Sequence, residues 1–192
     1  MNLFGLVYFI FLLIPKIDSC RICHGGEALS YENSVHAPLF TCKECHGGDP
    51  SDMRKTAMSP SKGFRKLKSK KEIAFMCSKC HSDVEKMLPY GKLVDEFRVY
   101  KTSKHGILLF EKGDEKVAVC TDCHGVHDIK RTADPSSSVS PFNVPFTCAK
   151  CHSDKDYMKD YKIPTDQFEK YKNSIHGRLR LEKKRYEGSV MS

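Results

Sequence analysis

The sequence predicts a mostly α-helical protein with long loops, in which short helices surround an interior that aliphatic side chains alone do not fill. Hydrophobic residues make up 40% of the 192-residue chain, which is low for a self-sufficient core, and part of that share lies in the first 14 residues. All ten cysteines fall into pairs of one spacing. The stretch from Cys77 to His105 recurs 71 residues later, from Cys148 to His176, and carries helix start and stop signals.

The first element is an apolar run, Leu3–Ile14, that is typical of a secretory signal. As a helix it would span about 18 Å, well short of the roughly 30 Å of hydrocarbon in a bilayer. We assign residues 1–19 to a signal peptide cleaved after Ser19. A short uncleaved N-terminal anchor is the alternative, because no Lys or Arg precedes the run. The protein is therefore expected to be exported, to the periplasm, the outer face of the cytoplasmic membrane or the extracellular space.

The cysteines organise the rest of the chain. Each of the five pairs reads Cys-x-x-Cys and is followed at once by histidine, and no cysteine is left over. Disulfides and zinc ribbons also use paired cysteines, but neither requires that histidine at every pair. Covalent haem attachment does, because two thiols three positions apart reach the two vinyl groups on one porphyrin edge, and the next residue lies under the ring, where its imidazole can bind iron.

The sequence thus predicts five covalent haem c groups. Their thioether positions are Cys20, Cys23, Cys42, Cys45, Cys77, Cys80, Cys120, Cys123, Cys148 and Cys151. Their proximal iron ligands are His24, His46, His81, His124 and His152.

With these motifs the chain resembles the multihaem c-type cytochromes over the span from Cys20 to His176. The resemblance implies short helices and loops wrapped round a stack of haems that are attached outside the cytoplasmic membrane. The stretch from Cys20 to His46 is most similar to small periplasmic tetrahaem cytochromes that take electrons from membrane quinols. It departs from them at Gly26, where they usually carry methionine, and in its shorter apolar run.

We divide the mature chain into a dihaem module (20–50), a basic linker (51–71) and a trihaem module (72–192) that contains the repeat and is truncated at its C-terminus. Cys77–His81 recurs as Cys148–His152, and Met191 stands where the next cysteine pair would begin, so the chain resembles a longer family that stops one module early. A Tyr-x-x-Ser-x-His stretch occurs three times, at Tyr31–His36, Tyr100–His105 and Tyr171–His176.

Helix signals lie around the last of these stretches. Pro164 to Asp166 predicts a helix start and Gly177 its stop, which would place His176 at the end of a helix. The segment Arg131–Thr147, rich in Ser and Pro, is expected to be a second linker without a function of its own.

Five haems have ten axial positions, and the chain has nine histidines. Because His127 follows His124 by three residues, both project to one side of a turn, and we expect His127 to bind a different iron. The four histidines outside the motifs are the predicted distal ligands: His36, His105, His127 and His176.

Two ligand maps follow. In the first, His36, His105 and His176 each bind the haem of the preceding motif and His127 binds that of Cys42–His46, which leaves the haem of Cys120–His124 short of a histidine. In the alternative, each binds a later haem and His176 has none. The open position could take Met53 or Met58, a histidine from a second copy of the chain, or a small substrate.

Charge indicates the partners. The formal net charge is +8, and six cations crowd the linker between the second and third motifs: Lys62, Arg65, Lys66, Lys68, Lys70 and Lys71. They form either a solvated loop or a docking surface for an acidic redox protein. We expect redox partners, a quinol-oxidising membrane donor or a terminal reductase, with self-association as a further alternative. Nucleic acid is not expected to bind a haem-filled exported protein.

Two functions are compatible with this pattern. The first is an electron carrier between a membrane or periplasmic donor and an extracytoplasmic acceptor. The alternative is a reductase of a small nitrogen or sulfur oxyanion at a haem that lacks a second histidine. We favour the carrier and assign no catalytic residue, because no motif has lysine in place of histidine, as the catalytic haem of pentahaem nitrite reductases often does.

Overall fold

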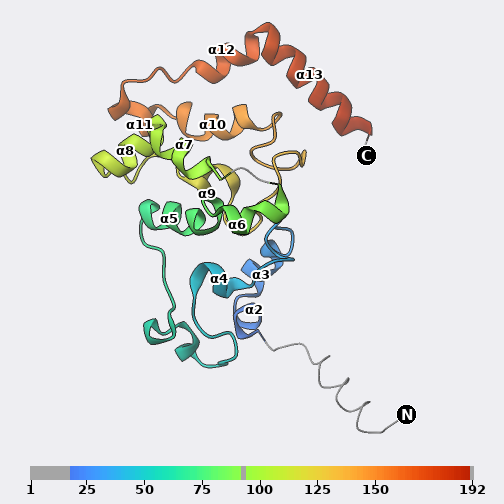
Figure 1. Ribbon diagram of the computed structural model, residues 1–192. Coiled ribbons are helices and arrows are strands. Elements are labelled where there is room, and N and C mark those ends of the chain that lie inside the picture. The colour runs from blue at the N-terminus through green and yellow to red at the C-terminus, as the bar shows by residue number, and fades with distance from the viewer. Residues whose placement is uncertain (1–17, 92–93, 191–192) are drawn as a thin grey trace, which may run out of the picture.

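The computed structural model describes residues 18–91 and 94–190, with side chains as far as residue 182 (Figure 1). The predicted signal peptide therefore lies almost wholly outside the described residues. Within them the chain forms α-helices and short 3-10 helices joined by loops, and no strand. The mostly α-helical class predicted from the sequence is confirmed. None of the described helices is both long enough and apolar enough to cross a membrane.

The N-terminal part contains three short helices: α2 (Ser19–Cys23), α3 (Gly25–Tyr31) and α4 (Cys42–His46). Side chains at their ends explain where two of them start. The Asp18 carboxylate accepts the backbone N–H of Cys20 at 3.0 Å. Thr41 and Glu44 form a capping box at the start of α4. The Glu44 carboxylate accepts the backbone N–H of Thr41, and the Thr41 hydroxyl accepts a backbone N–H of the first helical turn. Two cysteine motifs therefore begin at capped turns.

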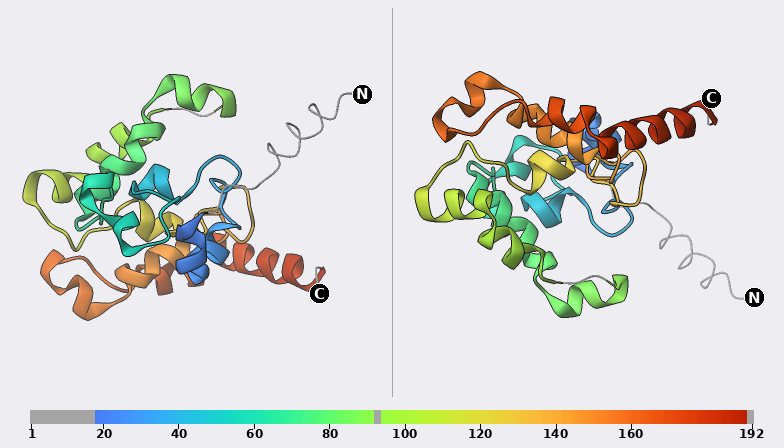
Figure 2. Two further views of the ribbon diagram at one scale, coloured as in Figure 1. Left: turned by 90° about the horizontal axis from the view of Figure 1, so that it is seen from below. Right: turned by 90° about the horizontal axis from the view of Figure 1, so that it is seen from above.

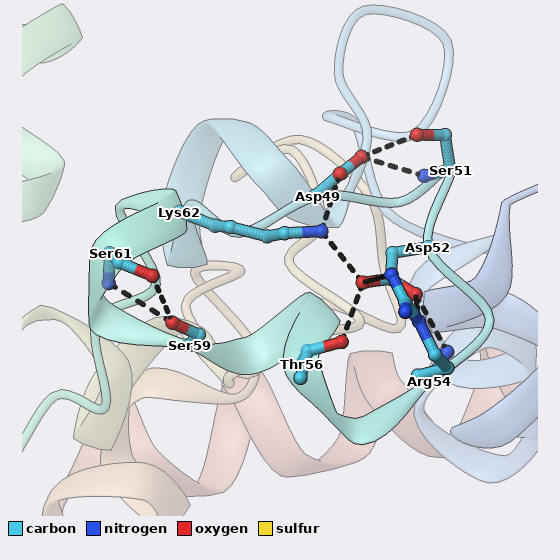
Figure 3. A network of polar contacts seen from close by, with 8 residues as sticks. All are labelled: Asp49, Ser51, Asp52, Arg54, Thr56, Ser59, Ser61 and Lys62. Carbon is cyan, nitrogen blue, oxygen red and sulfur yellow. Dashed lines mark hydrogen bonds and ion pairs between the residues drawn. The ribbon is translucent and has the colours of Figure 1, made fainter.

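A loop with η1 (Lys55–Met58) and η2 (Pro60–Lys62) follows α4, and a polar network closes it (Figure 3). The buried Asp52 carboxylate accepts hydrogen bonds from Arg54, Thr56 and Lys62, and these bonds hold its pKa below its usual range. The Lys62 ammonium also donates to Asp49 at 2.9 Å. Figure 3 shows Lys62 reaching across the loop between the two carboxylates. The expected linker is thus an ordered loop.

Two further lysines of the basic cluster also serve the fold. Lys70 donates to the Val117 carbonyl at 2.9 Å and to Asp122 at 2.8 Å, and Lys71 donates to the Phe110 carbonyl at 3.4 Å. Three cations of the cluster are exposed: Arg65, Lys66 and Lys68. Of the six cations, half are therefore engaged in contacts within the fold and half are open to solvent.

The same series of elements is formed twice, 71 residues apart. In the first copy it comprises α5 (Lys70–His81), α6 (Val84–Met87), η3 (Leu88–Tyr90), α7 (Glu96–Thr102) and α8 (Lys104–Lys112). In the second it comprises α10 (Val144–His152), α11 (Lys155–Met158), η4 (Lys159–Tyr161), α12 (Gln167–Asn173) and α13 (Ile175–Val190). Helix α9 (Cys120–His124) lies between the copies. Because α5 starts at Lys70, the predicted boundary at residue 71 falls in its first turn.

A small apolar core joins α5, α7, α8 and α9. Ala74, Leu109, Val117 and Val119 are buried in it. Next to them the rings of Phe75, Phe97 and Phe110 pack with centres 5.5–5.9 Å apart. Only eight hydrophobic residues are buried in the described part, and many large ones are exposed close to cysteine motifs, among them Ile22, Phe75, Val126 and Val144.

In Figure 1, α2–α4 lie at the bottom, α5 and α6 in the middle, and α10–α13 towards the top. Helix α13 projects from the rest of the fold in each view (Figure 2). Met53 and Met58, the two candidate iron ligands of the linker, are both exposed.

Candidate functional site

All five cysteine motifs are helical. Helices α2, α4 and α9 consist almost wholly of a motif, and α5 and α10 each end on one. Residues three apart in a helix share a face, so the two thiols of a pair point to the same side and the histidine follows on the next turn. All ten cysteines are free thiols. The two thiols of each motif are therefore on one side of its helical turn and form no disulfide with each other.

Successive motifs lie side by side. Burial raises the pKa of Cys45 and of Cys123, and the thiolate charge of a cysteine in the next motif adds to each rise. A contact between the Cys77 and Cys120 thiols raises the pKa of Cys77 and lowers that of Cys120. The motifs therefore follow each other in space in chain order, through the neighbouring thiols Cys20 and Cys42, Cys45 and Cys80, Cys77 and Cys120, and Cys123 and Cys148.

Six histidines form three pairs of facing rings. The ring centres are 6.1 Å apart for His36 and His81, 6.4 Å for His46 and His127, and 6.0 Å for His105 and His152. With about 2.0 Å from metal to imidazole nitrogen and about 1.1 Å from nitrogen to ring centre, two imidazoles on opposite sides of one metal have centres about 6.2 Å apart. Each pair thus has the separation of two axial ligands of a single metal.

Each pair joins one motif histidine to one histidine outside the motifs. Burial lowers the pKa of His36, His46 and His105, and the charge of the facing histidine lowers it further. Neutral imidazole is the form that binds a metal, so this environment favours ligation at neutral pH.

The pairing agrees with the sequence at one position and departs from the first ligand map at two. His127 faces His46 and not its neighbour His124, as the spacing predicted. His36 faces His81 rather than His24, and His105 faces His152 rather than His81. Both therefore face a later motif, as in the alternative map, and each passes over one motif to reach it. A hydrogen bond from the Val35 N–H to the Ile129 carbonyl, 2.8 Å long, brings the His36 turn against the chain that follows His127.

A serine turn positions the histidine of each repeat. The Ser103 hydroxyl donates to the Tyr100 carbonyl at 2.6 Å and accepts the Gly106 N–H at 3.1 Å, which ends α7 and starts α8. His105 therefore lies in the first turn of a new helix. A Cβ on Gly106 would lie 2.0 Å from the Tyr100 oxygen, so only glycine permits this approach.

The predicted helix stop at Gly177 is wrong, because the second copy of the repeat makes the same serine turn before this glycine. Helix α12 ends at Asn173, Ser174 makes the same two hydrogen bonds of 2.6 and 3.1 Å, and α13 begins at Ile175. A Cβ on Gly177 would lie 1.9 Å from the Tyr171 oxygen. Ser174 and Gly177 act as positioning residues that the sequence did not predict, although Ser-x-His-Gly occurs in both copies.

Three predicted site residues, His24, His124 and His176, are exposed, and in the part of the chain that the structure describes no second imidazole ring contacts them. His124 borders a cavity of about 320 Å³ that also contains Lys130 and Lys150. The expected Ser/Pro-rich linker forms one wall of it, since Ser138 donates a hydrogen bond to the Cys123 carbonyl.

No group of three or more His, Cys, Asp or Glu side chains among the described residues is placed to hold a metal ion. The facing pairs offer two nitrogens each. No protein-family model, curated protein or solved structure matches the chain.

Proposed function

We propose that the protein is a multihaem c-type cytochrome that carries electrons between a membrane or periplasmic donor and an extracytoplasmic acceptor. The observation that carries the proposal is the set of three imidazole pairs at 6.0–6.4 Å, each formed by the histidine of a Cys-x-x-Cys-His motif and a histidine from elsewhere in the chain. Porphyrin nitrogens fill four positions of a haem iron and leave two for the protein. A pair of imidazoles is the ligand set that such an iron takes.

The residues that would hold each group follow from the pairs. The second, third and fifth motifs would each bind iron with two imidazoles, from His46 with His127, His36 with His81, and His105 with His152. The first and fourth motifs would supply His24 and His124. A bound haem c supplies reversible one-electron chemistry. The polypeptide keeps consecutive motifs adjacent and covers little of the apolar surface beside them. This arrangement suits the transfer of electrons from one haem to the next.

Export and docking belong to the same proposal. Haem is attached to such motifs outside the cytoplasmic membrane in the cytochromes that this chain resembles, which agrees with the apolar run of the N-terminal segment. The exposed cations Arg65, Lys66 and Lys68 provide a basic surface for an acidic redox protein.

The decisive experiment counts haems on the secreted protein. Pyridine haemochrome absorbance and intact mass should give five per chain, and replacing Cys42 and Cys45 by serine should give four. A colourless protein, or one whose mass equals that of the polypeptide alone, would end the proposal.

Reduction of a small anion is the second candidate, and the cavity beside His124 favours it because Lys130 and Lys150 line it. Adding nitrite to the oxidised protein distinguishes the two. A change in the high-spin EPR signal, with nitrite consumed under reducing conditions, would support a reductase. An unchanged spectrum would leave the electron carrier.

A further inference from the structure

We propose that His176 is an axial ligand for the haem of a second Cys-x-x-Cys-His module, one that lies outside residues 1–192 and docks on the first turn of α13. This inference rests on the proposed function and names a partner for it. The docking face comprises Phe142, Tyr171, His176, Leu179 and Arg180, which line a cavity of about 500 Å³. We call it the His176 face.

The first argument is the structural equivalence of His176 and His105. Each is the second residue of a helix, and each follows a serine whose hydroxyl makes the same two bonds, 2.6 Å to a tyrosine carbonyl and 3.1 Å from a glycine N–H. In both turns the glycine approaches the tyrosine carbonyl so closely that a Cβ would not fit. A turn of this kind delivers His105 to a facing imidazole.

The second argument is that only one of the two turns is covered within the described residues. His105 is half-buried and faces His152 at the end of α10, and Leu108 packs against the apolar core. At the equivalent positions His176 is exposed and Leu179 is 58% exposed. The His176 face therefore keeps the ligand and the apolar neighbour of a docking site without the element that covers its counterpart.

The third argument is the chemistry of the lining. The Arg180 guanidinium lies over the Phe142 ring, 4.9 Å from its centre, and its Nε is buried with no hydrogen-bond partner among the described residues. A buried donor without an acceptor is costly, and a carboxylate satisfies it best. A haem group offers carboxylates at one edge, an apolar ring for Leu179, and iron for the imidazole.

These features select one occupant. The element that covers His105 is a helix ending in Cys-x-x-Cys-His, and the imidazole of that motif lies across from His105 at 6.0 Å. The occupant that fits the equivalent face is a module of the same kind, whose iron has its own histidine on one side and an open position on the other. The Arg180 guanidinium favours the negative charge that ionised haem carboxylates bring.

The test uses the full-length, haem-loaded protein and an isolated haem c peptide as probe, a short Cys-x-x-Cys-His peptide whose iron has one open axial position. EPR at neutral pH follows the high-spin ferric signal of the peptide as protein is added. We expect the wild type to convert the peptide to low spin and His176→Ala to lose that conversion. Arg180→Ala should weaken binding about tenfold, as loss of a charge-assisted hydrogen bond does. Arg178→Ala, exposed on the same helix but outside the cavity, should leave binding unchanged.

Conversion by the His176→Ala protein, or none by the wild type, would overturn the inference. A second copy of the chain is the competing occupant, and sedimentation of the protein alone tests for it. Self-association of the wild type that is absent in His176→Ala would assign the face to that copy. Haem counts on every sample separate the two proposals. Five haems with no peptide conversion reject the His176 face and leave the cytochrome, whereas a protein without haem rejects both.

Discussion

Replacing His36 by alanine tests whether each facing imidazole pair binds a single iron. The His36 ring lies 6.1 Å from that of His81, and among the described residues no ring contact joins it to His24. The substitution should therefore remove one ligand from the third motif only. One iron in five should change from low spin to high spin, because a haem iron with one imidazole has a weaker ligand field than one with two. EPR spin integration, referred to the pyridine haemochrome content, measures this fraction.

The identity of the affected haem needs a second background. Replacing Cys20 and Cys23 by serine removes the first haem, and His36→Ala in that protein should still create one high-spin iron. A gain that disappears in this background would assign His36 to the first motif, against the structure. An unchanged spin count in the single variant would refute the pairing altogether. His176→Ala is the matched control and should leave the count unchanged, because His176 is exposed and faces no imidazole in the described part.

Three further predictions concern the polypeptide. Gly106→Ala should lower the free energy of unfolding by about 2 kcal/mol or more, because the added Cβ would lie 2.0 Å from the Tyr100 carbonyl oxygen. A denaturant titration measures this loss. Gly25→Ala is the control and should not destabilise the protein, because its Cβ would meet no atom within 4 Å. Lys162→Gly should stabilise by about 0.5–1 kcal/mol, since Lys162 has φ 52° where the first copy has a glycine, and a lower melting temperature would contradict this reasoning. Asp52→Asn should expose the 47–65 loop to hydrogen exchange at neutral pH. Because bonded cations depress the pKa of Asp52, its contribution in the wild type is present in full above the unfolded value of about 3.9 and is lost progressively as the pH falls from that value through the lower folded pKa. Equal protection of the loop in the wild type and in Asp52→Asn at neutral pH would argue against the network.

Short sequence patterns predict the structure where the interactions that decide it lie within a few residues of chain. The three-residue spacing of His124 and His127 predicts that both side chains leave the same side of a turn, and the structure places the His127 ring 6.4 Å from that of His46. The start of α12 next to Asp166 follows from the same kind of signal. The predicted stop at Gly177 is wrong because glycine, which often ends a helix, here lies inside one, and its missing Cβ allows two backbone segments to meet. That role depends on a neighbour that the local pattern does not specify.

By itself the sequence determined the five Cys-x-x-Cys-His motifs, the mostly helical class and the histidines outside the motifs, because each depends on features within a few residues of chain. Only the tertiary structure decided which histidine faces which motif, which cations of the linker are used internally, and that His176 is exposed while His105 is covered. The reason is physical: a turn fixes the direction in which a side chain leaves the backbone, but its partner depends on how distant helices pack. In this fold the two histidines of each facing pair lie at least 45 residues apart along the chain.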